Sequence, residues 1–185
     1  LRMIADTPVA LSLSGGIDSG AICSIASKVF GKKLETFSII DTDNRYNESN
    51  LIDATAKDCG VKNHKINISK HEDYLSILDK SINQTNYPIT TITDLILYQL
   101  TSKIKEYGYK VCLSGSGGDE LFGGYYDHYL MYFNELRKKD PPKLKNFLKI
   151  WRKNIKPHIR NRFYLKHDLF FKNSNFRGYV YDNYE

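Results

Sequence analysis

The stretch that decides the fold reads Val9-Ala10-Leu11-Ser12-Leu13-Ser14-Gly15-Gly16-Ile17-Asp18-Ser19. An apolar run ends in Ser-Gly-Gly and a helical pattern follows from Ala21 to Phe30, so the stretch predicts a strand, a short loop and a helix. The two glycines allow positive φ angles and let the backbone approach a ligand without an intervening Cβ. Because a helix N-terminus presents unpaired N–H groups and the positive end of a dipole, we expect an anion to bind at this loop.

The loop departs from two common phosphate-binding motifs. A Walker A loop needs G-x-x-x-x-G-K-[ST] and a dinucleotide-binding turn needs G-x-G-x-x-G, whereas Gly15 and Gly16 are adjacent and no lysine follows them. The string Ser14-Gly15-Gly16-Ile17-Asp18-Ser19 instead resembles the pyrophosphate loop of ATP pyrophosphatases. The alternative interpretation is a glycine-rich turn with a serine cap.

Composition indicates a globular protein. The chain has 185 residues, of which 41% are hydrophobic and 26% charged, enough for one domain with a sizeable core. Cys23, Cys59 and Cys112 have no C-x-x-C spacing and fall in a helix, near a helix end and in a strand, so we expect buried, reduced thiols and a cytoplasmic protein. The sequence has no run of 18 apolar residues and no signal pattern. We expect it to be a piece of a longer protein, cut before Leu1 and ended at Glu185.

Charge divides the chain into two parts. Residues 135–185 carry fourteen Lys and Arg against five Asp and Glu, whereas residues 1–134 carry thirteen against sixteen. We therefore predict an α/β domain over residues 1–134 and a basic, aromatic-rich helical extension of the same domain, itself truncated, over residues 135–185.

The first part alternates strands and helices. After the first strand, strands are predicted at residues 34–40, 64–68 and 111–113, and helices at residues 51–59, 74–82 and 95–104. Gly31, Gly60 and Gly108 are expected helix stops. This alternation predicts right-handed βαβ units, a parallel sheet with helices on both faces, and a ligand beyond the carboxyl ends of the strands.

A second glycine-rich stretch follows the last predicted strand. It reads Leu113-Ser114-Gly115-Ser116-Gly117-Gly118-Asp119-Glu120-Leu121-Phe122-Gly123-Gly124-Tyr125. A tight turn needs only one or two glycines. Both loops are expected at the same edge of the sheet, where Asp18 and Asp119 could share a hard cation that bridges phosphate oxygens. The alternative role for Asp119 is to cap the short helix after it.

Together the two stretches resemble the synthetase domain of the glutamine-dependent asparagine synthetases. The resemblance covers residues 2–130. Supporting pieces occur in the order of that family: Asp6-x-Pro8-Val9, Thr36-Phe37-Ser38-Ile39, Tyr46-Asn47-Glu48-Ser49 and Tyr98. It implies an α/β fold with a parallel sheet flanked by helices, of the adenine nucleotide alpha hydrolase-like, ATP-pyrophosphatase type, with a helical C-terminal extension.

The resemblance also implies a site and a reaction. ATP would contact Leu13, Ile39, Ser114 and Gly115; pyrophosphate would bind Ser14, Gly15, Gly16 and Ser19; Mg²⁺ would be held by Asp18 and Asp119. A side-chain carboxylate, aspartate in the family, would attack ATP to give an acyl-adenylate and pyrophosphate, and ammonia would then displace AMP and leave an amide. A separate glutaminase domain, expected in the full-length chain, supplies the ammonia.

One position departs from the family. An acid is usual where this chain has Ser116, and a hydroxyl cannot act as an ionised base at neutral pH. We therefore expect amide formation to be slow or the accepted nucleophile to differ. The predicted catalytic residues are Asp18, Asp119 and Ser116.

Two other functions stay open at this stage. Lysines and arginines alternate with Phe163, Tyr164, Phe170, Phe171 and Phe176, a pattern found on nucleic-acid-binding surfaces and consistent with an RNA-modifying ATP pyrophosphatase. We favour packed aromatics with solvated lysines, and therefore expect neither a nucleic-acid nor a membrane partner. The other alternative is a nucleotide-binding module that has lost catalysis. The five histidines have no i, i+4 pair, which argues against zinc; the oligomeric state is open.

Overall fold

The computed structural model describes residues 4–41, 43, 47–67, 74–89 and 91–176. The chain divides into two compact units, Leu1–Ser116 and Gly117–Glu185. The boundary after residue 134 was drawn from charge alone, and as a domain boundary it stays a prediction.

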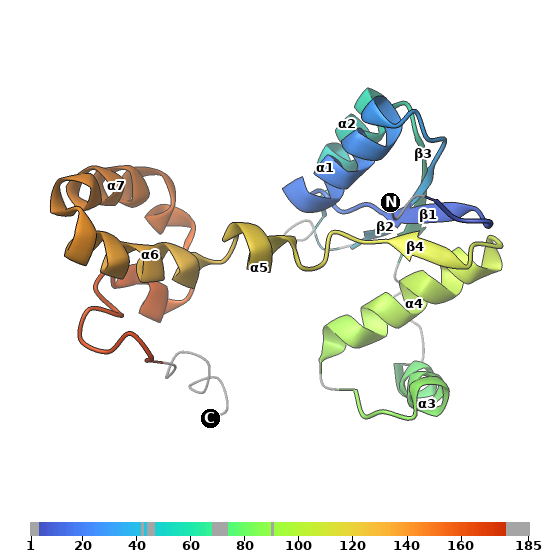
Figure 1. Ribbon diagram of the computed structural model, residues 1–185. Helices are drawn as coiled ribbons and strands as arrows, with labels where there is room; N and C mark the ends of the chain where they lie inside the picture. The colour runs from blue at the N-terminus through green and yellow to red at the C-terminus, as the bar shows by residue number, and fades with distance from the viewer. Residues whose placement is uncertain (1–3, 42, 44–46, 68–73, 90, 177–185) are drawn as a thin grey trace. The chain divides into compact units, whose positions relative to one another are not determined.

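The first unit contains a four-stranded parallel sheet in the order β3-β2-β1-β4 (Figure 1). Its strands are β1 (Val9–Ser12), β2 (Glu35–Ile40), β3 (Lys62–Asn67) and β4 (Val111–Leu113). Leu11 pairs with Thr36 of β2 and with Leu113 of β4, so β1 lies inside the sheet. The third strand begins two residues earlier than predicted, and Ile68 lies outside the described residues.

Helices cover both faces of this sheet. They are α1 (Ile17–Ser24), which continues as the π-helical turn η1 (Ile25–Val29), α2 (Ser49–Cys59), α3 (Tyr74–Thr85) and α4 (Ile92–Glu106). Because side chains alternate along a strand, Leu11 joins the core under α1 and α2, whereas Ala10 joins the core under α4. Figure 1 shows α1 and α2 on one face and α4 on the other. The predicted fold class, a parallel sheet flanked by helices, is confirmed.

The second unit is helical. It contains α5 (Gly118–Phe122), α6 (Tyr126–Lys139), α7 (Pro141–Asn154) and the short 3₁₀ turns η2 (Lys156–His158) and η3 (Arg162–Leu165). Helix α6 ends before Pro141-Pro142, and both prolines open α7, whose first turn is capped by Asp140 accepting a hydrogen bond from the Lys143 N–H at 3.0 Å.

The aromatic residues of the basic segment belong to the core of this unit. Phe170 is fully buried with Phe133 and Trp151, and Phe133 and Trp151 meet edge to face with ring centroids 5.8 Å apart. The other predicted aromatics, namely Phe163, Tyr164, Phe171 and Phe176, pack partly buried against the same cluster. Packing therefore accounts for the alternation of basic and aromatic residues.

Among the residues that the structure describes, no helix combines the length and the apolar character needed to cross a membrane.

Candidate functional site

The first glycine loop is held together by Ser19. This side chain is buried, and its hydroxyl accepts a hydrogen bond from the Ser14 N–H at 3.1 Å and lies 2.9 Å from the Ser14 hydroxyl. It also lies within hydrogen-bond distance of the carbonyl oxygens of Ser14 and Gly16. The Ser14 hydroxyl in turn accepts from the Gly16 N–H at 3.1 Å. The two serines therefore fix the loop between β1 and α1 through its own backbone.

The glycines of this loop are needed for space and not for positive φ. Neither Gly15 nor Gly16 has a positive φ, and Gly16, the N-cap of α1, has φ of −79°. That part of the expectation is wrong. A Cβ on Gly15 would instead lie 2.8 Å from the Cβ of Glu48, closer than atoms can approach. The close approach that requires glycine is thus made by a side chain of the protein itself.

Glu48 is the residue of this loop region that sequence reasoning missed. Its Oε2 accepts a hydrogen bond from the Gly15 N–H at 3.0 Å, across 33 positions of sequence. In the sequence, Glu48 is part of the supporting motif Tyr46-Asn47-Glu48-Ser49, of which Tyr46 lies outside the described residues. The available signal was its place between the carboxyl end of β2 and the start of α2, at the sheet edge where the loop was expected.

The second glycine loop reaches the first within the same unit. A Cβ on Gly115 would lie 2.9 Å from the backbone nitrogen of Ser19 and 3.1 Å from the Cβ of Asp18. Ser114 and Ser116 join their hydroxyls at 2.8 Å, and the Ser116 N–H donates to the Ser114 hydroxyl at 3.2 Å. The prediction that both loops lie at one edge of the sheet is therefore confirmed, since β1 and β4 are neighbours and Gly115 packs on the Asp18–Ser19 peptide.

Two residues expected at the nucleotide lie at strand ends. Leu13 is buried; its N–H donates to the Phe37 carbonyl and its own carbonyl accepts from the Ser38 hydroxyl. Ile39 is half-buried near the end of β2. Contacts of Leu13 and Ile39 with a nucleotide stay predictions.

Asp119 belongs to the second unit. The N-cap of α5 is Gly117, with φ of 91°, and no side chain forms a cap hydrogen bond there, so the alternative that Asp119 caps this helix is wrong. A Cβ on Gly124 would fall 1.6 Å from Oδ1 of Asp119, so a glycine is required where the carboxylate lies. Because Asp18 is in the first unit, the sharing of one cation by Asp18 and Asp119 stays a prediction.

The neighbouring acid, Glu120, pairs with the tyrosine that ends the motif. The Tyr125 hydroxyl donates to Oε1 of Glu120 at 2.6 Å. This hydrogen bond lowers the pKa of Glu120 and raises the pKa of Tyr125 to about 12. This hydrogen bond therefore joins α5 to the residue that precedes α6, and the carboxylate of Glu120 stays ionised near neutral pH.

A metal ion at this site would have few protein ligands. The described residues contain no group of three or more His, Cys, Asp or Glu side chains able to hold an ion. Asp18, in the first turn of α1, makes no side-chain hydrogen bond or ion pair within the described part of the chain. Its oxygens suit a hard cation whose other ligands come from phosphate and water.

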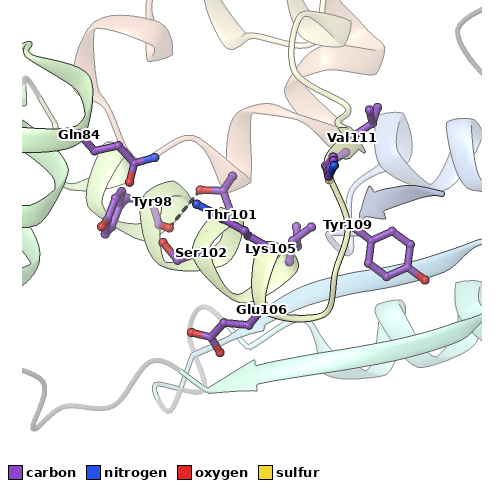
Figure 2. A pocket seen from close by; sticks show the side chains of 11 residues that line it. Gln84, Tyr98, Thr101, Ser102, Lys105, Glu106, Tyr109 and Val111 are labelled. Carbon is purple, nitrogen blue, oxygen red and sulfur yellow. Dashed lines mark hydrogen bonds between the residues drawn. The ribbon is translucent and has the colours of Figure 1, made fainter. Parts of the chain in front are cut away.

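A pocket of about 870 Å³ lies elsewhere in the first unit. Figure 2 shows its lining, with Tyr98, Thr101 and Lys105 from α4, and with Tyr109 and Val111 from the segment that enters β4. Val111 begins β4, whereas the glycine loops follow the carboxyl ends of β1 and β4. Because parallel sheets bind ligands at their carboxyl ends, we assign the candidate site to the loops and not to this pocket.

Comparison with known proteins identifies relatives for nearly the whole chain. The family model for asparagine synthase matches residues 1–179. Asparagine synthetase [glutamine-hydrolyzing] 1 of Bacillus subtilis is 38% identical over 125 residues, which are 68% of this chain and 19% of that protein. Asparagine synthetase B [glutamine-hydrolyzing] of Escherichia coli is 29% identical over 163 residues, 77% of this chain and 28% of that protein. The chain thus spans less than a third of the length of either relative.

Among solved structures, an NH₃-dependent NAD synthetase from Campylobacter jejuni matches with a TM-score of 0.43 and 22% identity. The match covers 65% of this chain and 52% of that one.

Proposed function

We propose a function for the chain from one established premise: it belongs to the asparagine synthase family. The proposed function is ATP-dependent formation of an amide bond by the full-length protein, through an acyl-adenylate. The observation that carries it is the convergence of two glycine loops at the carboxyl ends of adjacent strands, with Gly115 packed on the Asp18–Ser19 peptide. Two loops that meet in this way can surround a polyphosphate with backbone amides.

The first loop is proposed to bind the β,γ-pyrophosphate of ATP. Ser14, Gly15, Gly16 and Ser19 carry backbone and hydroxyl donors that hydrogen-bond within the loop and to Glu48, and these are proposed to turn to the phosphates. The N-terminus of α1 follows the same loop. The fit of an anion to this loop is supported at Gly15. This residue has no Cβ, and its N–H already donates a hydrogen bond to an anionic oxygen, that of the Glu48 carboxylate. Ser114 and Gly115, with Leu13 and Ile39, are proposed to contact the rest of the nucleotide.

Asp18 and Asp119 are proposed as the protein ligands of Mg²⁺. Asp18 offers oxygens that make no hydrogen bond or ion pair within the described residues, and Mg²⁺ prefers a small number of carboxylates together with phosphate oxygens. A bound Mg²⁺ would neutralise charge on the phosphates.

The proposed reaction has two steps. A carboxylate oxygen of the substrate, aspartate or another small acid, attacks the α-phosphorus of ATP; the acyl–phosphate bond forms as the bond to pyrophosphate breaks. Ammonia then attacks the acyl carbon, the amide forms, AMP leaves and a proton is released. Negative charge accumulates on the departing pyrophosphate, and the donors of the Ser14–Ser19 loop stabilise it because they are already positioned.

The ammonia is proposed to come from a glutaminase domain of the full-length protein. The curated relatives are named glutamine-hydrolysing, and they extend well beyond the length of this chain. A cytoplasmic location is part of the same proposal.

Ser116 is proposed to lie in the catalytic set without acting as a base. Its hydroxyl is hydrogen-bonded to the Ser114 hydroxyl at 2.8 Å, an arrangement that orders the loop. A serine hydroxyl stays protonated at neutral pH, so any ionised base for ammonia must come from another residue or from the substrate.

Nucleotide binding and exchange test the proposal. We expect the full-length protein to bind ATP with Mg²⁺ more tightly than AMP in calorimetry, and, with aspartate present as the carboxylate, to catalyse Mg²⁺-dependent exchange of pyrophosphate into ATP. Asp18→Asn should abolish exchange and leave the melting temperature nearly unchanged. Asp53→Asn is the matched control, since Asp53 lies on α2 in an ion pair with Lys65. Equal binding of AMP and ATP by the wild-type protein would remove the pyrophosphate assignment.

A further inference from the structure

Glu48 accepts a hydrogen bond from the Gly15 N–H, the same donor that the proposed phosphate ligand needs. Its Oε2 accepts the Gly15 N–H hydrogen bond at 3.0 Å. A Cβ built on Gly15 would meet three atoms of the glutamate, with Cβ at 2.8 Å, Oε2 at 3.0 Å and Cδ at 3.1 Å. The glutamate side chain therefore lies along the whole width of Gly15, from its stem to its carboxylate.

This contact differs in kind from the others in the loop. The N–H groups of Ser14 and Gly16 donate to neutral hydroxyl groups of the loop itself. The Gly15 N–H donates to a charged oxygen from another element, and hydrogen bonds to ionised acceptors are the stronger class. A carboxylate is itself an anion, so it uses the amide in the way that a phosphate oxygen would.

The backbone of Glu48 is fixed while its side chain is exposed. Its carbonyl accepts hydrogen bonds from the N–H groups of Leu51 and Ile52, and Ile52 is buried in the core beneath α2. The side chain is exposed and can rotate away from Gly15 without moving the start of α2. The contact can therefore exchange with a ligand.

The segment that carries the loop has one acid beside it and no basic side chain. Asp18 follows the two glycines, and residues 9–27 contain no Lys or Arg. A free pyrophosphate that reached the Gly15 N–H would displace one carboxylate and approach another, with no basic side chain from this segment to offset the repulsion. A divalent cation bound to the pyrophosphate removes much of that repulsion.

We infer that Glu48 is a specificity-determining residue of this loop. Its carboxylate competes with phosphate for the Gly15 N–H, so the loop accepts pyrophosphate as its complex with a divalent cation and rejects the free anion. This inference rests on the proposed function, because it assigns pyrophosphate to the loop. Glu48 is a competitor and positioning group, and takes no part in bond making or breaking.

The experiment measures binding of inorganic pyrophosphate by calorimetry to the full-length protein, with excess EDTA and with saturating Mg²⁺. The variant is Glu48→Gln, which keeps the shape and an acceptor oxygen but removes the charge. In EDTA we expect Glu48→Gln to bind pyrophosphate about five- to tenfold more tightly than wild type, the effect of removing one nearby like charge. With Mg²⁺ the difference should fall to about twofold or less.

Two further variants separate the effect of the charge at position 48 from the effects of a charge elsewhere and of side-chain length. Asp53→Asn removes one negative charge from α2, the helix that begins after Glu48, at a residue that pairs with Lys65, and should leave both affinities unchanged. Glu48→Asp keeps the charge with a shorter stem and should retain the wild-type dependence on Mg²⁺. If Glu48→Gln binds pyrophosphate no better than wild type in EDTA, or binds it more weakly under both conditions, Glu48 supports the loop and the inference is overturned while the proposed function stands. If the wild-type protein binds pyrophosphate under neither condition, both fail.

Discussion

Replacing Gly115 by alanine tests whether the two glycine loops pack against each other in solution. The new Cβ would lie 2.9 Å from the Ser19 nitrogen and 3.3 Å from the Asp18 carbonyl carbon, both backbone atoms that cannot rotate away. The loops must therefore move apart, and overpacking of this kind costs about 1–3 kcal/mol in the free energy of unfolding. The same movement should weaken binding of ATP with Mg²⁺, because it displaces the start of α1.

Gly20→Ala is the matched control. Gly20 lies inside α1, and a Cβ there would meet only Thr55, at 3.8 Å, which is an ordinary contact. Alanine in a helix interior is more stable than glycine by about 0.5–1 kcal/mol. The same chemical change is thus expected to have opposite effects on stability at two positions beside Ser19. Gly20 follows Ser19 in the sequence, and Gly115 packs on the Ser19 nitrogen.

Urea denaturation of the purified protein, followed by far-UV circular dichroism, measures both effects. The two variants should differ by about 1.5–4 kcal/mol, which at an m-value of about 2 kcal/mol/M separates their midpoints by about 0.75–2 M. A Gly115→Ala midpoint at or above that of wild type, with Gly20→Ala behaving as expected, would show that the loops do not make this contact.

Two other predictions concern Ser116 and Glu35. In the full-length protein, Ser116→Glu should raise ammonia-dependent amide formation, on the order of 10²-fold if it supplies a positioned base, while Ser116→Ala changes adenylation little; a wild-type rate above that of Ser116→Glu would contradict this. The hydrogen bond with His64 holds the pKa of Glu35 below its ordinary value of 4.5. Because the pKa of Glu35 is lower in the folded than in the unfolded protein, its ionised carboxylate stabilises the fold at pH values above 4.5. This stabilisation is lost as the pH falls below 4.5 and through the lower pKa of the folded protein. The melting temperature of Glu35→Gln should therefore fall less between pH 5 and pH 3 than that of wild type, and parallel curves would show that the contact contributes nothing.

Much of the fold followed from local pattern. The run Val9–Leu13, the alternation of strands with helices and the glycines after three of the helices were enough to place β1, β2 and β4 and the helices of the first unit within a few residues. The order of the strands depends on pairing between distant segments, such as Val9 with Val111, and no local signal carries it.

The site was predictable in its loops and not in its contacts. Ser14–Ser19 and Ser114–Gly115 were identified because a strand followed by glycines is a local feature. Glu48 was missed as a contact because 33 residues separate it from Gly15. Glycine at position 15 was assigned to positive φ and to the close approach of a ligand, and the contact with Glu48 was missed because that side chain comes from another element.

The position of β4 has a consequence for the order of events during synthesis. Ala10 pairs with Glu35 on one side and with Cys112 on the other, so its second partner emerges from the ribosome about eighty residues after its first, roughly 4–16 s later at about 5–20 residues per second. Throughout that interval one edge of β1 has no neighbour, and Gly115 is absent from the loop that it later supports. We expect the nascent chain to depend on chaperones during this time. Labelling of the Cys112 thiol measures when the interval ends, because the thiol becomes half-buried, and is labelled more slowly, once β4 joins the sheet.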